Sequence, residues 1–207
     1  GCLNLHPGQL PEYAGLHTHQ WAIRNDEPSC ATTLHWMKEG IDTGDIAYMR
    51  EILIGPRDTG LSLFMKCMKS GAELVIKALD DIAVGVEPPK TAQDLTRRKL
   101  YTNEHARCGS IRWEWSSRQI YNFVRAADYH PFDSPTYVPT ATLIDGREIS
   151  ILKAELVADP NLEVGQVSSS DSRGVIVGAG DRQGVLITKI RDHNQAVVKG
   201  AAITEVI

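Results

Sequence analysis

A short run at the start of the chain alternates apolar and polar residues and then meets a proline. On a strand, side chains alternate between two faces, so Asn4 and His6 share one face and the leucines beside them share the other. Pro7 cannot donate to a strand ladder and favours an extended residue before it, so we expect the strand to end at His6. An amide and an imidazole are therefore predicted at the carboxyl end of a strand, where open α/β sheets bind ligands.

A loop rich in glycine and aspartate lies between two further predicted strands. Residues 29–37 and 46–54 are rich in strand-forming residues, and residues 40–45 between them read Gly-Ile-Asp-Thr-Gly-Asp. Alone, such a segment is typical of a solvated turn, because Asp and Gly tolerate unusual backbone angles. Because two strands hold this loop, we expect Asp42 to point at His6. A carboxylate there would raise the pKa of the imidazole and fix its tautomer.

Apolar residues at helical spacing predict three helices, over residues 15–25, 61–83 and 116–126. The second follows an Asp-Thr pair and the third begins with two serines, and all of these are good capping residues. Residues 87–99 contain two adjacent prolines and predict a crossing over the surface. We expect the basic triplet at residues 97–99 to be a solvated loop rather than a phosphate site.

After residue 132 the composition changes to short alternating runs separated by turn residues. These runs predict strands over residues 137–144, 148–157, 174–177, 185–190 and 202–207. Several short strands at this spacing are typical of a small β-barrel or sandwich. We therefore divide the chain into a first domain over residues 1–127 and a second, β-rich domain over residues 128–207.

Taken together, the segments form the pattern Asn-x-His-Pro-x-x-Leu-Pro-x-Tyr-x-Gly, then a tryptophan helix, a strand and Gly-x-Asp-Thr-Gly-Asp-Ile. This pattern resembles the signature of the formyltransferases that use N10-formyltetrahydrofolate, a family that includes methionyl-tRNA, glycinamide ribonucleotide, amino-sugar and hydroxyornithine formyltransferases. The positions that carry the resemblance are Asn4, His6, Pro7, Leu10, Pro11, Tyr13, Gly15, Trp21, Gly40, Asp42, Thr43, Gly44 and Asp45.

The resemblance implies a fold for each domain. It implies an α/β fold in which the first domain is the C-terminal half of a Rossmann-like formyltransferase domain. The second domain would be a small open β-barrel of the OB type. Members of the family carry an earlier βα portion, so we expect this sequence to lack the N-terminal part of the catalytic domain and to belong to a longer polypeptide.

The resemblance also implies three catalytic residues. Asn4 would donate a hydrogen bond to the oxyanion that develops when an amine attacks the formyl carbon. His6 would share this stabilisation and move protons, and Asp42 would set the charge and position of His6. The reaction requires no metal and no covalent intermediate.

The same resemblance implies binding residues. The main chain around Gly40, Ile41 and Asp42 would bind the pterin ring of the folate, which is the formyl donor. Tyr13 and Gly15 would contact the acceptor.

Charge along the chain bears on the acceptor. Residues 127–207 carry 7 Lys and Arg against 11 Asp and Glu, whereas the first 126 residues balance at 15 against 15. A barrel that binds tRNA should offer positive charge to the phosphates. Residues 10–23 also look closer to the amino-sugar and hydroxyornithine enzymes. We therefore expect a nucleotide-linked amino sugar as acceptor, with methionyl-tRNA and hydroxyornithine as alternatives.

Three further interpretations remain. A formyltetrahydrofolate hydrolase would use the same trio with water in place of the amine. A non-enzymatic folate- or partner-binding module would keep the pocket without the reaction. An aspartic protease is suggested by the Asp-Thr-Gly triplets at Asp42 and Asp58, but these flank a single strand instead of lying on separate lobes, so we disfavour it.

The amino-acid composition indicates the cellular compartment that we expect for the protein. The hydrophobic fraction is 42% and the charged fraction 23%, as expected of a soluble globular protein, and no apolar run reaches the length of a membrane span. Cys2, Cys30, Cys67 and Cys108 are scattered without a CxxC pair, which favours free thiols in a reducing compartment over a disulfide frame or a zinc site. We expect a cytoplasmic protein, with a homodimer as one option.

Overall fold

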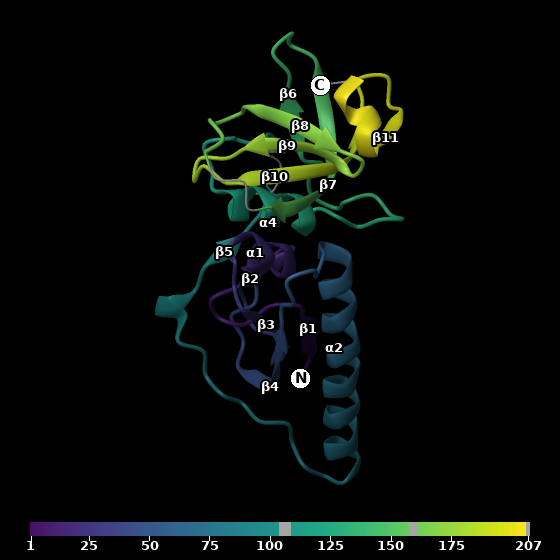
Figure 1. Ribbon diagram of the computed structural model, residues 1–207. Helices are drawn as coiled ribbons and strands as arrows, with labels where there is room; N and C mark the ends of the chain where they lie inside the picture. Colours follow the sequence, from purple (N-terminus) through teal and green to yellow (C-terminus); the bar gives the residue numbers. More distant parts are fainter. Residues whose placement is uncertain (104–108, 158–160, 206–207) are drawn as a thin grey trace. The chain divides into compact units, whose positions relative to one another are not determined.

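The computed structural model describes residues 1–103, 109–157 and 161–205 (Figure 1). It divides into two compact units, each described by itself below. Unit 1 comprises Gly1–Ile23 and Glu27–His105, and unit 2 comprises Arg24–Asp26 and Ala106–Ile207.

Unit 1 is built on a three-stranded sheet in the order β1-β3-β4. Strands β1 (Leu3–His6), β3 (Ser29–Trp36) and β4 (Ile46–Leu53) confirm the three strands expected from the sequence, including the end of β1 at His6. All pairing in this sheet is antiparallel. A Rossmann-like sheet is mostly parallel, so these strands do not confirm that arrangement, and it stays a prediction for this unit.

One long helix covers this sheet. Helix α2 (Gly60–Ala83) begins at a capping box, in which the Thr59 hydroxyl accepts from the Ser62 amide and the Ser62 hydroxyl accepts from the Thr59 amide. The helix residues Leu74 and Ala78 pack on Leu34 of β3. Leu3 and Leu5 of β1 pack against the same cluster. The leucines of β1 thus face the core, as predicted.

Two short elements complete unit 1 around the functional residues. Helix α1 (Thr18–Arg24) is shorter than the predicted 15–25, because Ala14–Gly15 form strand β2 instead. β2 pairs in parallel with β5 (Leu100–Tyr101), so the segment after α2 returns to the start of the chain.

Unit 2 contains a six-stranded antiparallel sheet. Its order is β6-β7-β10-β9-β8, with β11 beside β10. The strands are β6 (Thr140–Thr142), β7 (Glu148–Val157), β8 (Val167–Asp171), β9 (Gly174–Gly178), β10 (Gly184–Arg191) and β11 (Val197–Lys199). The observed sheet agrees with a β-rich second unit, and the OB type of barrel stays a prediction.

Helix α4 (Ser117–Ala126) belongs to unit 2, capped by Ser116 as expected. Its residues Ile120, Phe123 and Val124 join the core formed by the inward side chains of the sheet. The division between the units therefore precedes α4, whereas the boundary expected from the sequence follows it at residue 127.

Two sequence predictions in unit 2 were wrong in detail. β8 and β11 were missed, because β8 consists largely of serine and β11 is three residues long. The strand expected over residues 202–207 is part of a 3-10 helix, Gly200–Glu205, as far as the described residues extend. Its apolar residue Ile203 is fully buried in the core.

None of the helices within the described ranges combines the length and the apolar character that a membrane span requires.

Candidate functional site

The end of β1 brings the first two predicted residues into place. Asn4 lies directly across the ladder from His35, and His6 lies across from Thr33. The turn that follows is fixed by two hydroxyl groups: Thr18 Oγ1 donates to the Pro7 carbonyl and Thr33 Oγ1 donates to the Gly8 carbonyl, both at 2.7 Å. His6 is 4% exposed. Proline and these two hydrogen bonds therefore hold the imidazole at the strand end.

The loop between β3 and β4 turns Asp42 back toward this strand end. Gly40 and Asp42 have positive φ angles of 93° and 54°, a conformation that Gly adopts freely and Asp tolerates. Thr43 Oγ1 donates to the carbonyls of Glu39 and Gly40 at 2.8 and 3.2 Å. A Cβ on Gly44 would lie 1.5 Å from the Trp36 carbonyl oxygen, so only glycine fits there.

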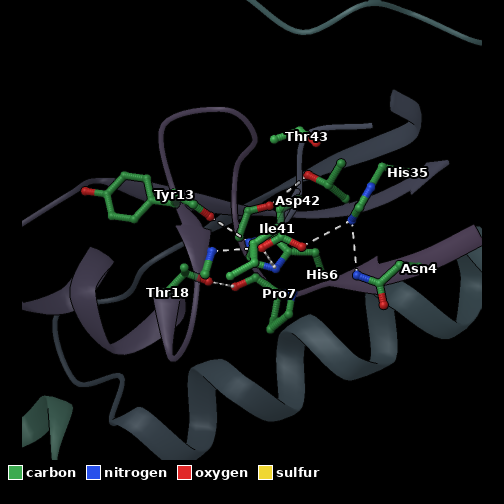
Figure 2. Close-up of polar contacts among 12 residues, drawn as sticks. Asn4, His6, Pro7, Tyr13, Thr18, His35, Ile41, Asp42 and Thr43 are labelled. Carbon is green, nitrogen blue, oxygen red and sulfur yellow. Dashed lines mark hydrogen bonds and ion pairs between the residues drawn. The ribbon is translucent and has the colours of Figure 1, made fainter. Parts of the chain in front are cut away.

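Asp42 is the centre of the site (Figure 2). Its Oδ2 lies 3.5 Å from His6 Nδ1 and its Oδ1 lies 3.4 Å from His35 Nε2. Oδ2 also accepts a 2.8 Å hydrogen bond from the Gly15 amide. The expected pairing of Asp42 with His6 is therefore present, and the carboxylate contacts a second histidine as well.

Sequence analysis missed His35. It is 3% exposed, and its Nε2 lies 3.1 Å from Asn4 Nδ2 (Figure 2). A histidine inside a strand gives no local signal of function. Only the pairing of β3 with β1 puts His35 beside Asn4. The register of that pairing cannot be predicted from the sequence of β3 alone.

His6 is held by a main-chain carbonyl. Its Nε2 lies 2.6 Å from the carbonyl oxygen of Tyr13, and because a carbonyl only accepts, Nε2 is the donor. The nitrogen that faces Asp42 is therefore Nδ1.

Burial decides the charge of His6. Desolvation lowers the pKa of His6, and this outweighs the opposing influence of Asp42 and of the hydrogen bond to Tyr13. Asp42 does raise the pKa of His6, as expected, but the sequence did not indicate how deeply the ring is buried, and burial sets the net direction. Burial alone would raise the pKa of Asp42, but its contacts with His35, His6 and the Gly15 amide together lower it.

Tyr13 and Gly15, expected to contact an acceptor, are both tied into the site. The phenol of Tyr13 donates to Glu27 at 2.6 Å, and its ring stacks on Tyr101 with centroids 5.2 Å apart. Their main-chain groups hold His6 and Asp42 respectively. Gly15 has a φ of 96°, and a Cβ there would lie 2.2 Å from the Tyr101 carbonyl oxygen. Contact with an acceptor stays a proposal for both residues.

The segment after α2 clamps the Asp42 loop. Gln93 Nε2 donates to the carbonyls of Asp42, at 2.9 Å, and of Gly44. Arg98 Nη2 donates to the Ile41 carbonyl at 2.8 Å. The basic triplet was expected to be a solvated loop, and Arg98 departs from this because the β2-β5 pairing draws it to the loop.

A cavity of about 480 Å³ adjoins these residues. Its polar lining comes from Asn4, His6, His17, His19, Asp42 and Thr102. The apolar lining comes from Leu16, Ile41, Phe64, Leu100 and Tyr101. Ile41 is 59% exposed although it is apolar, so its side chain is available to a ligand. An apolar wall beside a few polar groups is typical of a small-molecule site.

Asp58 has a structural role at the start of α2. Its carboxylate accepts from the Gly55 amide at 2.6 Å, from the Ser62 hydroxyl at 2.9 Å and from Lys66 at 2.6 Å. These partners account for an aspartate at this position without a second catalytic carboxylate.

The described cysteines are free thiols: Cys2 is exposed, whereas Cys30 and Cys67 are buried with their sulfur atoms 3.9 Å apart. Cys108 lies outside the described residues. Within the described ranges, no group of three or more His, Cys, Asp or Glu side chains is arranged to hold a metal ion.

Two family models match the sequence. The model described as "Formyl transferase" matches residues 1–79, and the model described as "Formyl transferase, C-terminal domain" matches residues 106–206.

Curated relatives match most of the chain. The methionyl-tRNA formyltransferase of Halothermothrix orenii is 33% identical over 87% of this chain and 57% of its own length. That of Clostridium acetobutylicum is 31% identical over 92% of this chain and 59% of its own length. The chain thus spans less than two thirds of the length of each of these two relatives.

Solved structures share the fold. The N-formyltransferase from Helicobacter canadensis, in complex with folinic acid and dTDP-3-aminofucose, aligns with a TM-score of 0.73 at 20% identity, over 89% of this chain and 65% of that one. HypX from Aquifex aeolicus, in complex with tetrahydrofolic acid, aligns with a TM-score of 0.69 at 22% identity. The alignment covers 98% of this chain and 34% of HypX.

Proposed function

Because the chain belongs to the formyltransferase family, we propose that the protein containing it transfers the formyl group of N10-formyltetrahydrofolate to a primary amine. The observation that carries this proposal is the Asp42 carboxylate, 3.5 Å from His6 and 3.4 Å from His35, with Asn4 beside it. An amide donor, a neutral imidazole and an ionised carboxylate are the groups that formyl transfer to an amine requires.

Asn4 has the role of oxyanion donor. When the amine nitrogen attacks the formyl carbon, the formyl oxygen gains negative charge, and an amide N–H aimed at it stabilises that charge. One such donor contributes about 3 kcal/mol to the transition state. Asn4 lines the cavity and needs no movement of the main chain to reach a ligand there.

His6 and Asp42 together accept the proton that the attacking amine must lose. The lowered pKa of His6 keeps the ring neutral near pH 7, and its Nε2 hydrogen is committed to Tyr13. The basic lone pair is therefore on Nδ1. A proton taken up there lies next to Asp42 Oδ2, whose charge stabilises the imidazolium that results.

The Asp42 loop binds the donor. The folate supplies the formyl group, and Gly40, Ile41 and Asp42 would hold its ring through main-chain groups and the exposed side chain of Ile41. The hydrogen bonds from Gln93 and Arg98 preorganise this loop, which lowers the entropy lost on binding. Tyr13 and Gly15 support the same wall and approach the acceptor.

The acceptor in this proposal is the amino group of a nucleotide-linked amino sugar. The net negative charge of residues 127–207 supports a small acceptor over an RNA. The structural similarity to an enzyme solved with dTDP-3-aminofucose points the same way, although it is a similarity of fold.

Methionyl-tRNA is the second candidate acceptor. A specific observation favours it: the two relatives described above, at 33% and 31% identity, are both methionyl-tRNA formyltransferases.

The test is a formylation assay with the full-length protein that contains this chain. The protein is incubated with N10-formyltetrahydrofolate and, separately, with a dTDP-linked amino sugar, hydroxyornithine or methionyl-tRNA, and the products are identified by mass spectrometry. A formylated sugar nucleotide supports the proposal. A formylated product on tRNA alone shows that methionyl-tRNA, and not an amino sugar, is the acceptor. Tetrahydrofolate release without a formylated acceptor indicates a hydrolase, and an unchanged donor indicates a binding module.

A further inference from the structure

His35 is buried next to two of the side chains to which chemistry is assigned above. It lies directly opposite Asn4 in the β1-β3 ladder, so both side chains project from the same face of the sheet. Its Nε2 atom lies 3.1 Å from Asn4 Nδ2 and 3.4 Å from Asp42 Oδ1 (Figure 2). One ring nitrogen therefore faces both an amide and a carboxylate.

The other ring nitrogen decides where the hydrogen of the neutral ring lies. His35 Nδ1 is 3.1 Å from the main-chain carbonyl oxygen of Trp36, which can only accept a hydrogen bond. Nδ1 therefore carries the hydrogen, and Nε2 of the neutral ring is a lone pair. The NH2 group of Asn4 can donate to this lone pair, whereas an ionised Asp42 cannot.

This arrangement fixes which way the Asn4 amide faces. With the nitrogen toward His35, one N–H is used in the hydrogen bond and the second remains available to a ligand in the adjoining cavity. With the amide reversed, its oxygen would oppose the Nε2 lone pair, which leaves two acceptors facing one another. The neutral ring therefore selects one of the two amide orientations.

Resting on the proposed function of Asn4, we propose that His35 is a positioning residue that holds the Asn4 amide with its nitrogen toward the reacting oxygen. A doubly protonated ring would instead donate from Nε2 to Asp42 Oδ1, and the Asn4 nitrogen would then face a second donor and turn away. The titratable groups that face His35 among the described residues are Asp42 and, beyond it, His6.

The first test reads the tautomer directly. The full-length protein is labelled with 15N in its histidine rings, and the His35 signals are assigned by their loss in His35→Gln. The expected spectrum at neutral pH has hydrogen on Nδ1 and none on Nε2. A hydrogen on Nε2 would overturn the proposal. This result does not depend on turnover, so it stands even if the protein formylates no amine.

The second test compares two substitutions at the same position. His35→Phe fills the space of the ring without an acceptor, and His35→Gln restores an oxygen acceptor near Asn4. We expect His35→Phe to lower kcat roughly 10- to 100-fold, with the KM values of both substrates changed less than about threefold. His35→Gln should recover a large part of this loss. The matched control is His193→Phe, because His193 is exposed in unit 2.

A double-mutant cycle separates positioning from general support of the fold. If His35 acts through Asn4, then Asn4→Ala costs much less in the His35→Phe background than in the parent protein. Independent effects that multiply, or a His35→Gln enzyme no better than His35→Phe, would contradict the proposal. If His35→Phe does not fold, the tautomer measurement still decides the question.

Discussion

The Nε2 atom of His6 donates a 2.6 Å hydrogen bond to the main-chain carbonyl of Tyr13. This contact sets the tautomer of the ring, because it leaves Nδ1 as the nitrogen that faces Asp42. A residue seven positions along the chain thus orients the histidine through its backbone alone. Gly8, in the turn after β1, lies so close to this hydrogen bond that a larger residue there would collide with both partners.

Gly8→Ala should displace His6. A Cβ on Gly8 would lie 2.5 Å from His6 Nε2 and 2.6 Å from the Tyr13 carbonyl oxygen, closer than real Cβ contacts allow. We expect a destabilisation of about 1–3 kcal/mol and at least a tenfold loss of kcat, measured by chemical denaturation and the formylation assay. Parent-like activity in Gly8→Ala would show that the His6–Tyr13 hydrogen bond is dispensable.

Asn4→Ala should lower kcat by roughly 100-fold, because one oxyanion donor is removed from the transition state. The melting temperature should change by only a few degrees, since Asn4 is only partly buried. The control is Asn194→Ala, an exposed asparagine in unit 2, which should leave both quantities unchanged. A kcat for Asn4→Ala within threefold of the parent would remove Asn4 from the mechanism.

Asp42→Asn should lower kcat by roughly 100-fold or more, because the side chain keeps its shape and loses the charge that stabilises a protonated His6. The folded-state pKa of Asp42 is lowered, so its ionised form stabilises the folded protein above the ordinary aspartate pKa. That contribution is lost as the pH falls through the folded-state pKa. Unfolding measured at pH 7 and pH 3 should therefore show a smaller acid-induced loss for Asp42→Asn than for the parent.

The buried His19 gives a second reason to expect the free energy of unfolding to fall at acid pH. Burial lowers its pKa from 6.5 to about 3, and His17 and His6 contribute in the same direction. The folded protein therefore favours the neutral ring, and stability present above pH 6.5 is lost as the pH falls toward 3, by up to about 1.4 kcal/mol for each pH unit.

His19→Gln should flatten this dependence when unfolding is followed by urea titration between pH 7 and pH 4. His193→Gln is the matched control, because His193 is exposed in unit 2. Equal slopes for the parent and His19→Gln would show that His19 does not titrate across folding.

Arg98→Ala should weaken donor binding. Arg98 donates to the Ile41 carbonyl, so its loss loosens the loop proposed to hold the folate. We expect the KM for N10-formyltetrahydrofolate to rise about three- to tenfold, with a smaller change in the KM for the amine. Arg97→Ala is the control, because the neighbouring Arg97 pairs with Glu12 instead. Equal effects of the two substitutions would point to overall charge.

Much of unit 1, and helix α4 of unit 2, follow from local patterns. The alternation ended by Pro7 predicted β1, and the capping residues before α2 and α4 predicted where both helices begin. These features depend on residues close together in the chain, so a single sequence is enough to reveal them. The loop with Asp42 was also legible, because it lies between two strongly patterned strands.

The remainder of the site depended on contacts between distant segments. His35 becomes significant only through the register of β3 against β1, and Gln93 and Arg98 only because their segment returns beside the Asp42 loop. The charge of His6 depended on how deeply the ring is buried, and composition does not report burial at one position.

The sequence by itself therefore determined strands β1, β3 and β4, the long helix α2, and the family to which the pattern around Asn4, His6 and Asp42 points. Tertiary structure alone decided which nitrogen of His6 faces Asp42, that a second histidine contacts Asp42, and which distant residues hydrogen-bond to the loop. The physical reason is range: strand alternation and helix capping act over a few neighbouring residues, whereas hydrogen-bond partners and desolvation are set by whatever the folded chain brings together.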